Sequence, residues 1–386
     1  MTTPLYAQDG VNVSEGDDFS AFAAAVCRST FANSPFVKAH DFSRGHFRGP
    51  RGWRFVNLPD TYYMDAAADG IGTKVMLIDA VRRHFTAPRD VLAMTAGDIT
   101  RWGGKPLIFM NVLDVASLGA TGSPLNDALR AMMTGLVDAA KEQDIVCWRG
   151  ETAELGACVG SENPHALAKF NWAGVMLGVY LPDRIINGET LAPAQVVVAL
   201  EERGLRSNGF SSVRKALALA YGDERWLHPE AEGRIRAAAM PSALYDKFLA
   251  DANGWTCPVS KPRFRFRLVT HVTGGGIVGK FGEDMLFPRG LSAELTHLFP
   301  PPQIARWVAE TRGMEDAECY RTFGCGNGVL VVLDAEEADG FIAMARDYGV
   351  NAKQCGIIQD SKGRVPTLTI HSEFSGEILK YSPTQR

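Results

Sequence analysis

Three glycines stand within five positions just before an apolar, β-branched run, and this feature limits the fold of the chain more than any other. Residues 320–328 read Tyr-Arg-Thr-Phe-Gly-Cys-Gly-Asn-Gly, and the run Val-Leu-Val-Val-Leu follows them directly. Glycine permits positive φ angles and a close approach of other backbone, whereas β-branched residues favour a strand. The segment therefore predicts a tight turn that enters a buried strand. The pattern alone fits a functional turn and an ordinary strand entry.

Length and composition exclude several classes of protein. The chain has 386 residues, which favours two domains over a single core. Its net charge of −4 gives no sign of a nucleic-acid binder, and no apolar run approaches the roughly 18 residues that span a bilayer. Seven cysteines without a Cys-x-x-Cys pair favour reduced thiols over disulfides or a zinc site. We therefore expect a cytoplasmic protein that binds neither nucleic acid nor membrane.

Helical and strand patterns alternate along the chain and predict an α/β (α+β) fold. Strands are expected at residues 62–67, 107–115, 145–148, 173–180, 196–200, 329–333 and 354–359. Helices are expected at residues 18–26, 75–83, 88–102, from Ser123-Pro124 onward, 211–221 and 336–348. Residues 33–58 are expected to form a loop. Prolines and polar residues at 181–194 place the boundary between a domain of residues 1–183 and one of residues 184–386.

Residues 69–74, Asp-Gly-Ile-Gly-Thr-Lys, combine a carboxylate, two glycines, a hydroxyl and an ammonium before a predicted helix. Glycines let backbone amides face a phosphate, and a helix start favours negative charge. Mg²⁺ prefers one or two carboxylates together with phosphate oxygens, so Asp69 is a candidate ligand. An ordinary glycine turn with a solvated Lys74 fits the same pattern.

Two further carboxylates stand where a site is expected. Asp98 lies in an otherwise apolar helix, where a charge needs a partner or a polar face. Glu151 follows a predicted strand, and strand ends commonly line sites in α/β proteins. Residues 274–280 match the opening of a phosphate-binding P-loop, but Phe281 stands where a Ser or Thr must bind Mg²⁺. P-loop nucleotide hydrolysis is therefore not expected.

Seven motifs, in order, resemble those of the AIR synthetases (phosphoribosylformylglycinamidine cyclo-ligases). They are residues 6–13, 69–74, 93–106, 150–154, 207–215, 271–276 and 320–328. The resemblance implies a two-domain architecture whose N-terminal domain binds ATP and pairs its sheet across a homodimer. It also implies an enzyme that uses ATP and Mg²⁺ to close formylglycinamidine ribonucleotide to 5-aminoimidazole ribonucleotide, with release of ADP and phosphate, in purine biosynthesis.

The resemblance also implies roles for single residues. The implied Mg²⁺ ligands are Asp69, Asp98 and Glu151. The implied nucleotide-binding residues are Gly70, Gly72, Thr73, Lys74, Asp98, Glu151 and Thr152. Asp69, Asn208 and His271 are the implied catalytic residues, the last two near the substrate.

Departures from the family cluster near these sites. Residues 42–51 replace a glycine-rich loop and carry Arg44 and Arg48, which suit bidentate phosphate binding. We expect this loop to close over a phosphate of ATP or of the ribonucleotide, with a merely solvated loop as the alternative. Arg206 stands where the family has His, and Asn111 where it has Asp. These changes leave open a superfamily enzyme with a different phosphorylated acceptor, or a non-catalytic homologue.

Overall fold

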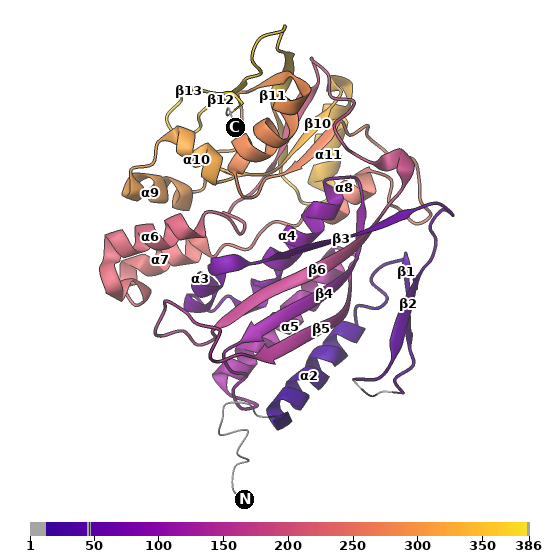
Figure 1. Cartoon of the computed structure of the whole chain (residues 1–386), viewed down its shortest axis with the longest axis vertical. Helices are drawn as coiled ribbons and strands as arrows, with labels where there is room; N and C mark the ends of the chain where they lie inside the picture. Colours follow the sequence, from indigo (N-terminus) through magenta and orange to yellow (C-terminus); the bar gives the residue numbers. More distant parts are fainter. Residues whose placement is uncertain (1–12, 45, 47, 384–386) are drawn as a thin grey trace, which may run out of the picture. The chain divides into compact units, whose positions relative to one another are not determined.

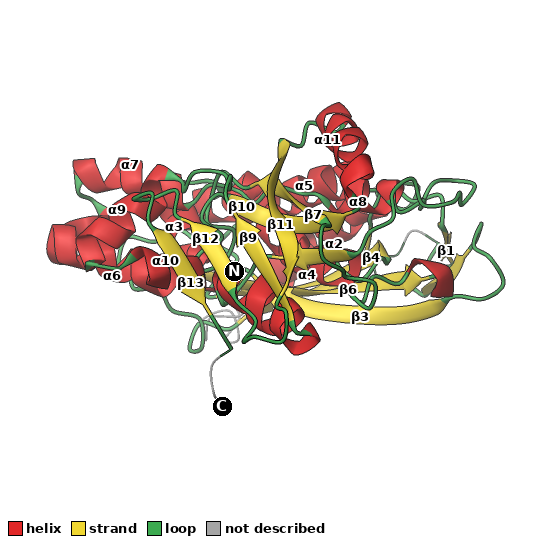
Figure 2. Cartoon of the chain, turned by 90° about the horizontal axis from the view of Figure 1, so that it is seen from above, coloured by secondary structure: helices red, strands yellow, loops and turns green. Residues whose placement is uncertain are grey.

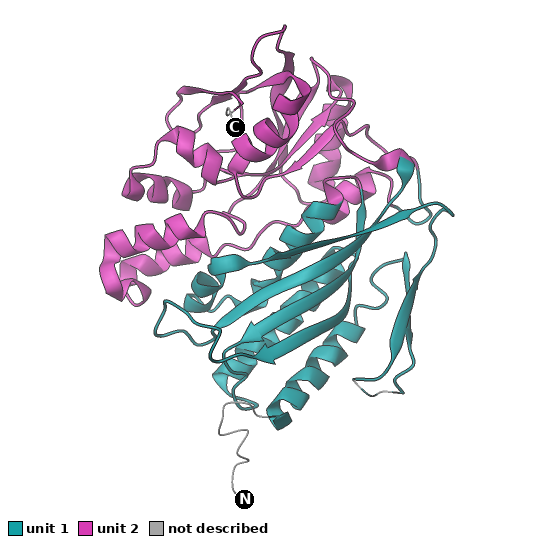
Figure 3. Cartoon of the chain, viewed as in Figure 1, with its two compact units in different colours: residues 1–99, 104–182, 256–260 teal, residues 100–103, 183–255, 261–386 magenta. Residues whose placement is uncertain are grey.

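The computed structural model describes residues 13–44, 46 and 48–383, and the chain divides into two compact units (Figures 1 and 3). Unit 1 comprises residues 1–99, 104–182 and 256–260, and unit 2 comprises residues 100–103, 183–255 and 261–386. The main division lies beside the boundary expected after residue 183. Two short segments cross this division: residues 100–103 belong to unit 2 and residues 256–260 belong to unit 1. The sequence pattern did not indicate either exchange.

A four-stranded sheet forms the centre of unit 1, in the order β3-β6-β4-β5. Its strands are β3 (Tyr63–Gly70), β4 (Lys105–Val115), β5 (Val146–Glu154) and β6 (Phe170–Tyr180). Only the β4–β5 pair in this sheet is parallel; β6 runs antiparallel to both β3 and β4. The sheet is thus mixed, as expected of an α+β domain.

Helices cover one face of this sheet (Figures 1 and 2). The helical segments are α2 (Val13–Arg28), η1 (Gly72–Lys74), α3 (Val75–Ala80), η2 (His84–Thr86), α4 (Pro88–Thr100) and α5 (Pro124–Glu142). The predicted start of α5 is confirmed, because the Ser123 side chain accepts a hydrogen bond from the Asn126 amide and Pro124 opens the helix. No helix in residues 13–44, 46 or 48–383 is long and apolar enough to span a membrane.

The second face of the sheet is much less buried. Residues whose side chains point toward the helices, such as Phe109, Trp172 and Met176, are fully buried. On the opposite face, Met64 of β3 is 63% exposed and Val112 of β4 is 40% exposed. The alternation follows from the two-residue period of a strand. It leaves an open face with apolar side chains.

Residues 33–58 do not form the expected loop. They contain a hairpin of β1 (Val37–Asp41) and β2 (Arg51–Phe55), paired antiparallel. The sequence of the hairpin is polar and rich in arginine, so its pattern did not indicate strands. Ring contacts stabilise it instead, since Trp53 meets Trp148 of β5 edge-on at 5.1 Å. Tertiary packing overrides local composition here.

Unit 2 is built on a seven-stranded sheet in the order β13-β12-β9-β11-β7-β10-β8. Its strands are β7 (Val196–Glu201), β8 (Leu268–His271), β9 (Leu291–Leu295), β10 (Asn327–Leu333), β11 (Ala352–Asp360), β12 (Leu368–His371) and β13 (Ile378–Tyr381). All neighbours are antiparallel except β12 and β9. The strands β8, β9, β12 and β13 are short, and none of them was predicted from the sequence.

Four α-helices of unit 2 were not predicted from the sequence, namely α7, α8, α9 and α10. The helical segments are α6 (Phe210–Tyr221), η4 (Gly222–Trp226), α7 (Pro229–Ala238), α8 (Asp246–Ala252), η5 (Val278–Leu286), η6 (Phe287–Arg289), α9 (Gln303–Arg312), α10 (Asp316–Thr322), η7 (Ala335–Glu337) and α11 (Ala338–Asp347). The segment η3 (Pro182–Arg184) leads from one unit to the other along the chain.

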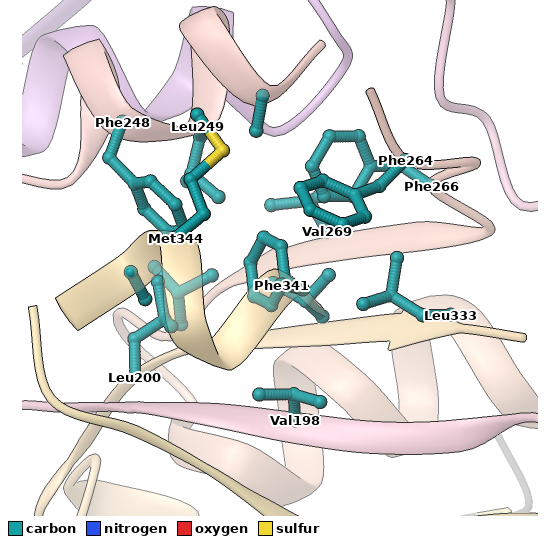
Figure 4. Packing of buried hydrophobic residues seen from close by; sticks show 14 of the residues in the cluster. Val198, Leu200, Phe248, Leu249, Phe264, Phe266, Val269, Leu333, Phe341 and Met344 are labelled. Carbon is teal, nitrogen blue, oxygen red and sulfur yellow. The ribbon is translucent and has the colours of Figure 1, made fainter. Parts of the chain in front are cut away.

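An aromatic cluster fills the core between β7, β10 and the helices α8 and α11 (Figure 4). Phe341 of α11 lies at its centre, with the ring of Phe248 at 5.0 Å, of Phe264 at 5.5 Å and of Phe266 at 5.7 Å. Burial of such rings contributes roughly 1.5–3 kcal/mol each. This core holds the strands that position the motifs of unit 2.

Candidate functional site

One row of residues crosses all four strands of the unit 1 sheet. Asp69 of β3 pairs with Gly174 of β6, Gly174 pairs with Asn111 of β4, and Asn111 pairs with Gly150 of β5. Neighbouring strands lie about 4.8 Å apart, so the first and last residues of the row are about 14 Å from each other. The sheet therefore divides the candidate residues of unit 1 into two groups, one at each edge.

The first group is a carboxylate pair formed by Asp69 and Asp98. Burial and, to a smaller extent, the negative charge of Asp98 raise the pKa of Asp69, which is half-buried. A hydrogen bond from the Gly70 amide to Asp69 Oδ1, at 2.7 Å, acts in the opposite direction. Two like charges held together in a partly buried place suit a bound cation.

The turn after Asp69 needs its glycines. Gly72 has a φ of 67°, and a Cβ there would meet no atom within 4 Å, so the turn is open on that side. A Cβ on Gly70 would lie 3.1 Å from the Trp172 carbonyl oxygen, which is tighter than ordinary contact. Thr73 is exposed in the same turn. The backbone of this turn can thus be approached by a ligand.

Lys74 does not reach the surface of this turn. Its side chain is fully buried, and its ammonium donates a hydrogen bond of 2.7 Å to Asp90 Oδ1, itself buried in α4. From the sequence we expected the Lys74 ammonium to contact a phosphate, and its placement beside Asp90 corrects that expectation. The charge of Lys74 is used inside the unit, where a buried ammonium requires an anionic partner.

The second group surrounds a pocket of about 230 Å³ at the other edge of the sheet. Helix α2, the β1–β2 hairpin and strands β4 and β5 all contribute to it. The lining residues are Ser20, Ala23, Ala24, Cys27, Arg48, Arg51, Asn111, Met133, Trp148, Arg149, Gly150, Glu151 and Thr152. We call it the arginine pocket. Glu151 and Thr152 therefore lie within β5, not beyond a strand end as the sequence pattern suggested.

Positive charge is concentrated in the arginine pocket. Burial lowers the pKa of Arg51, and the neighbouring charges of Arg149 and Arg28 lower it further. The Arg51 guanidinium also lies 5.9 Å from the centre of the Trp148 ring. Arg48 forms an ion pair with Asp17 of α2. Several guanidinium groups that repel one another favour an anion such as a phosphate between them.

The loop that carries these arginines is fastened to α2. Arg28 Nε donates to Asp41 Oδ2 at 2.8 Å, and Arg28 Nη2 donates to the His46 carbonyl at 3.2 Å. Hydrogen bonds from Ser43, with a further contribution from Arg28, lower the pKa of Asp41 to about 2. Arg44 is exposed, has a φ of 53°, and is not among the residues that line the arginine pocket. Of the two arginines named from the sequence, the structure thus brings only Arg48 to the pocket.

A single three-carboxylate metal site does not form within the chain. Asp69 and Asp98 are close together, but Glu151 lies on the strand at the opposite edge of the sheet. In the part of the chain that the structure describes, no three His, Cys, Asp or Glu side chains are grouped to hold a metal. The order of the strands separates Asp69 from Glu151, and the packing of α4 brings Asp98 close to Asp69.

Three sequence motifs of unit 2 pack against one another. A Cβ on Gly209 would lie 2.1 Å from Phe323, and one on Gly276 would lie 2.3 Å from the Tyr320 carbonyl oxygen. The Asn208 amide oxygen lies 3.8 Å from the Cβ position of Gly274. These contacts join residues 207–209, 274–276 and 320–323, and they explain why glycine occurs at the points of contact.

His271 lies in the interior beside a charged cluster. Arg206 Nη2 is 2.6 Å from His271 Nε2, and Arg206 Nη1 donates to Glu202 Oε2 at 3.3 Å. The Tyr245 ring lies 5.6 Å from the Arg206 guanidinium. His271 is 1% exposed, whereas Asn208 is partly exposed at the start of α6. Of these two predicted residues, only Asn208 presents a side chain to solvent.

The glycine run that resembles a P-loop has a different structure. Gly275 and Gly276 have φ angles of 93° and 60°, and residues 278–286 form the π-helix η5. A P-loop instead leads from its glycines into an α-helix whose first turn holds Mg²⁺. The structure supports the exclusion of P-loop chemistry that Phe281 had indicated.

Comparison with known families covers both units. Residues 54–177 match the N-terminal domain of AIR synthase related protein, and residues 192–368 match its C-terminal domain. The phosphoribosylformylglycinamidine cyclo-ligase of Paraburkholderia xenovorans (strain LB400) is 30% identical over 309 residues, which are 79% of this chain and 80% of that protein.

Solved structures share the fold at lower identity. Thiamine-monophosphate kinase from Stenotrophomonas maltophilia K279a has a TM-score of 0.57 and 13% identity, over 91% of this chain and 95% of the kinase. The hydrogenase maturation protein HypE, in complex with ATP, has a TM-score of 0.54 and 15% identity, over 86% of this chain and 87% of HypE. These likenesses confirm the predicted fold class.

Proposed function

The chain belongs to the AIR synthase related family, and we propose that it closes formylglycinamidine ribonucleotide to 5-aminoimidazole ribonucleotide in an ATP-dependent reaction. The observation that carries this proposal is the match of both domains to the family, together with relatives named phosphoribosylformylglycinamidine cyclo-ligase. The reaction would release ADP and phosphate and serve purine biosynthesis in the cytoplasm.

The chemistry depends on positioning more than on a strong acid or base. The formyl oxygen of the substrate takes the γ-phosphoryl group of ATP, a neighbouring nitrogen attacks the activated carbon, and phosphate leaves. Such a reaction requires phosphates held in line and their charge neutralised. Unit 1 offers groups of both kinds, at the two edges of its sheet.

At the β3 edge we propose a metal–phosphate site. Asp69 and Asp98 would hold Mg²⁺, and the backbone around Gly70 and Gly72, with the Thr73 hydroxyl, would face the phosphates. The raised pKa of Asp69 is the observation that fits a cation, because burial and the charge of Asp98 both disfavour its ionised form and a bound cation would favour it. Bound Mg²⁺ would neutralise phosphate charge during transfer.

At the β5 edge we propose a second phosphate site in the arginine pocket. Arg48, Arg51 and Arg149 supply the charge, and Glu151 and Thr152 line the same pocket. The two edges are about 14 Å apart, and both substrates carry phosphate. One edge can therefore hold the triphosphate of ATP while the other holds a phosphate at a separate position.

We also propose that the chain is a homodimer formed through the open face of the unit 1 sheet. Side chains of Met64, Val112, Val175 and Leu177 lie on this face, and the helices of the described part of unit 1 cover the opposite one. An exposed apolar sheet face of this kind marks an interaction surface. A second copy of the same face would bury it, as the family resemblance implies.

A different phosphorylated acceptor is the second candidate, and the contact between Arg206 and His271 favours it. The Arg206 guanidinium lies 2.6 Å from His271 Nε2. Arg206 itself stands where the family has a histidine. A residue implied to act near the substrate is therefore engaged inside the unit. This arrangement leaves the ATP-binding edge intact and alters only the acceptor side.

Turnover with defined acceptors tests these alternatives. We would supply the protein with ATP, Mg²⁺ and formylglycinamidine ribonucleotide, then measure ADP by a coupled assay and aminoimidazole ribonucleotide by mass spectrometry. Equal amounts of both products support the cyclo-ligase. ADP formed only with other phosphorylated acceptors supports the second candidate. Nucleotide binding without any turnover would overturn both and leave a non-catalytic homologue.

A further inference from the structure

A second pocket, within unit 2, is lined by residues that the proposed reaction does not use. Its volume is about 460 Å³. Two chain segments form most of it, residues 183–186 and residues 261–266, and the remaining lining residues are Asn253 and Glu337. We call it the rear pocket.

The rear pocket carries an excess of positive charge. Its cationic lining residues are Arg184, Lys261, Arg263 and Arg265, and its acidic ones are Asp183 and Glu337. Both carboxylate oxygens of Glu337 accept from the Arg265 amide, at 3.0 and 3.2 Å. The Asp183 side chain is 72% exposed, so water screens its charge. The cationic groups therefore outweigh the acidic ones.

Arg184 is the buried member of this set of cations, whereas Lys261, Arg263 and Arg265 are exposed. The Arg184 side chain is 6% exposed, and its nearest carboxylate oxygen, on the exposed Asp183, lies 3.6 Å from Nε, which is too far for a hydrogen bond. Arg184 Nε has no hydrogen-bond partner among the described residues. Burial lowers the pKa of Arg184. A buried guanidinium is costly unless an anion accepts its hydrogen bonds, and the rear pocket leaves room for one.

The guanidinium is also held in place. Arg184 Nη1 donates to the Asn253 carbonyl at 3.0 Å, and the Trp255 ring lies 5.7 Å from its centre. The Asn253 amide nitrogen donates to the carbonyls of Gly103 and Arg184, at 3.0 and 3.2 Å. A donor fixed in this way loses little conformational entropy when a ligand binds.

Aromatic side chains form the apolar part of the lining. Phe264 and Phe266 both line the pocket, and both pack on Phe341 in the core, so their rings are held. Arg263 lies over the Phe264 ring at 5.9 Å. A flat ring beside a fixed guanidinium is the arrangement that binds an anion carrying its own planar group.

We propose that the rear pocket binds a phosphate monoester that carries a planar ring, of the size of a nucleoside monophosphate. The phosphate accepts from Arg184, with Arg263 and Arg265 at the rim, and the ring lies against Phe264 and Phe266. This site belongs to unit 2 alone and is separate from the phosphate sites proposed in unit 1.

Calorimetry on the full chain at low ionic strength tests the site, with AMP, adenosine and inorganic phosphate as probes. We expect AMP to bind, and Arg184→Gln to weaken its binding at least about tenfold, since the charged hydrogen bond from the guanidinium to the phosphate is lost. Because Arg184 is buried, the exposed pair Arg263→Gln/Arg265→Gln provides a second variant, expected to weaken AMP binding several-fold. Arg346→Gln, an exposed arginine of α11, is the matched control and should bind as wild type.

The outcomes separate this site from the one in unit 1. Arg51→Gln, in the arginine pocket, should leave the Arg184-dependent binding of AMP unchanged. AMP binding that is the same in wild type, Arg184→Gln and the double variant would overturn the proposal. Inorganic phosphate that binds as tightly as AMP would overturn the ring contact. None of these readouts requires turnover, so they are independent of the proposed reaction.

Discussion

Asp69, at the end of β3, and Asp98, in α4, lie close enough for the charge of Asp98 to raise the pKa of Asp69, in addition to the larger effect of burial. The two residues come from different elements, so the fold brings two negative charges together. Like charges in a partly buried place destabilise the folded chain unless a cation lies between them. In this structure the ionised form of Asp69 is therefore disfavoured, and the proposed Mg²⁺ would favour it.

We expect Asp69→Asn to lower ATP-dependent turnover at least about 100-fold, because it removes a ligand of the proposed Mg²⁺. The same change should raise the melting temperature of metal-free protein at pH 7. Because the pKa of Asp69 is higher in the folded than in the unfolded chain, ionisation of Asp69 at pH 7 lowers the free energy of unfolding. Asparagine does not ionise, so the variant avoids this loss of stability. The ADP assay measures the turnover, and thermal unfolding with and without Mg²⁺ measures the change in stability. Asp65→Asn, an exposed carboxylate on the same strand, is the control; wild-type turnover in Asp69→Asn would refute the assignment.

The buried pair of Lys74 and Asp90 should be structural. Because each charge is buried, we expect Lys74→Met or Asp90→Asn alone to destabilise the chain by about 3–5 kcal/mol. The double variant Lys74→Met/Asp90→Leu should lose much less, since no buried charge is left uncompensated. Urea unfolding gives the free energies. Equal losses of unfolding free energy in the single and double variants would contradict this account. If Lys74→Met folds but no longer binds nucleotide, Lys74 would instead be a ligand-binding residue.

Arg51 and Arg44 should differ in their effect on phosphate binding. Arg51 lines the arginine pocket, so Arg51→Gln should weaken ATP or ribonucleotide binding about tenfold, and more strongly at low salt. Arg44 lies outside that lining, and Arg44→Gln should bind as wild type within error. Calorimetric titration at two salt concentrations measures the difference. Equal binding by both variants and wild type would mean that the loop is only solvated.

Assembly should depend on the open face of the unit 1 sheet. Light scattering of wild type should give twice the 41.9 kDa chain mass. Val112→Glu places a charge at the centre of the face and should yield monomers, because burying an unpaired charge is costly. Val365→Glu, an exposed apolar residue of unit 2, should leave the mass unchanged. A wild-type monomer at micromolar concentration would sink the dimer proposal.

The contact between Asp41 and Arg28, which holds the loop of residues 42–51 to α2, should weaken at acidic pH. The pKa of Asp41 is lowered to about 2, chiefly by hydrogen bonds from Ser43, so its stabilising contribution is present above the ordinary value of 3.8 and is lost as pH falls toward 2. Ser43→Ala should raise the pKa of Asp41 toward 3.8. An NMR titration of the Asp41 carboxyl carbon in both proteins measures this directly. An unchanged pKa in Ser43→Ala would assign the effect to the Ser43 amide and Arg28, both of which the variant retains.

Local patterns were enough to locate the longer strands and the longest helices. The cap at Ser123-Pro124 started α5 as expected, and apolar runs predicted β4, β6, β7 and β10 because strand and helix periods are written in consecutive residues. The glycine motifs likewise marked real turns, since Gly72, Gly209 and Gly276 have positive φ. The family resemblance added the order of these motifs, which no single segment contains.

Pairing across the fold was not available from those patterns. The β1–β2 hairpin was missed because its strands are polar and gain their stability from contact with Trp148, more than 90 positions away. Lys74 was assigned to a ligand because its sequence neighbours suit phosphate, yet Asp90 of α4 accepts its charge inside the unit. In both cases the residue that fixes the structure, Trp148 or Asp90, lies outside the local segment from which the prediction was made.

The sequence by itself determined the local chemistry: which residues can bend the backbone, carry charge or form a strand. Only the tertiary structure decided which of the three acidic residues meet, and it placed Asp69 with Asp98 while putting Glu151 about 14 Å away among arginines. The physical reason is strand order. Hydrogen bonding in the sheet sets which strands are neighbours, and electrostatic interactions act between neighbours in space, whatever their separation in the chain.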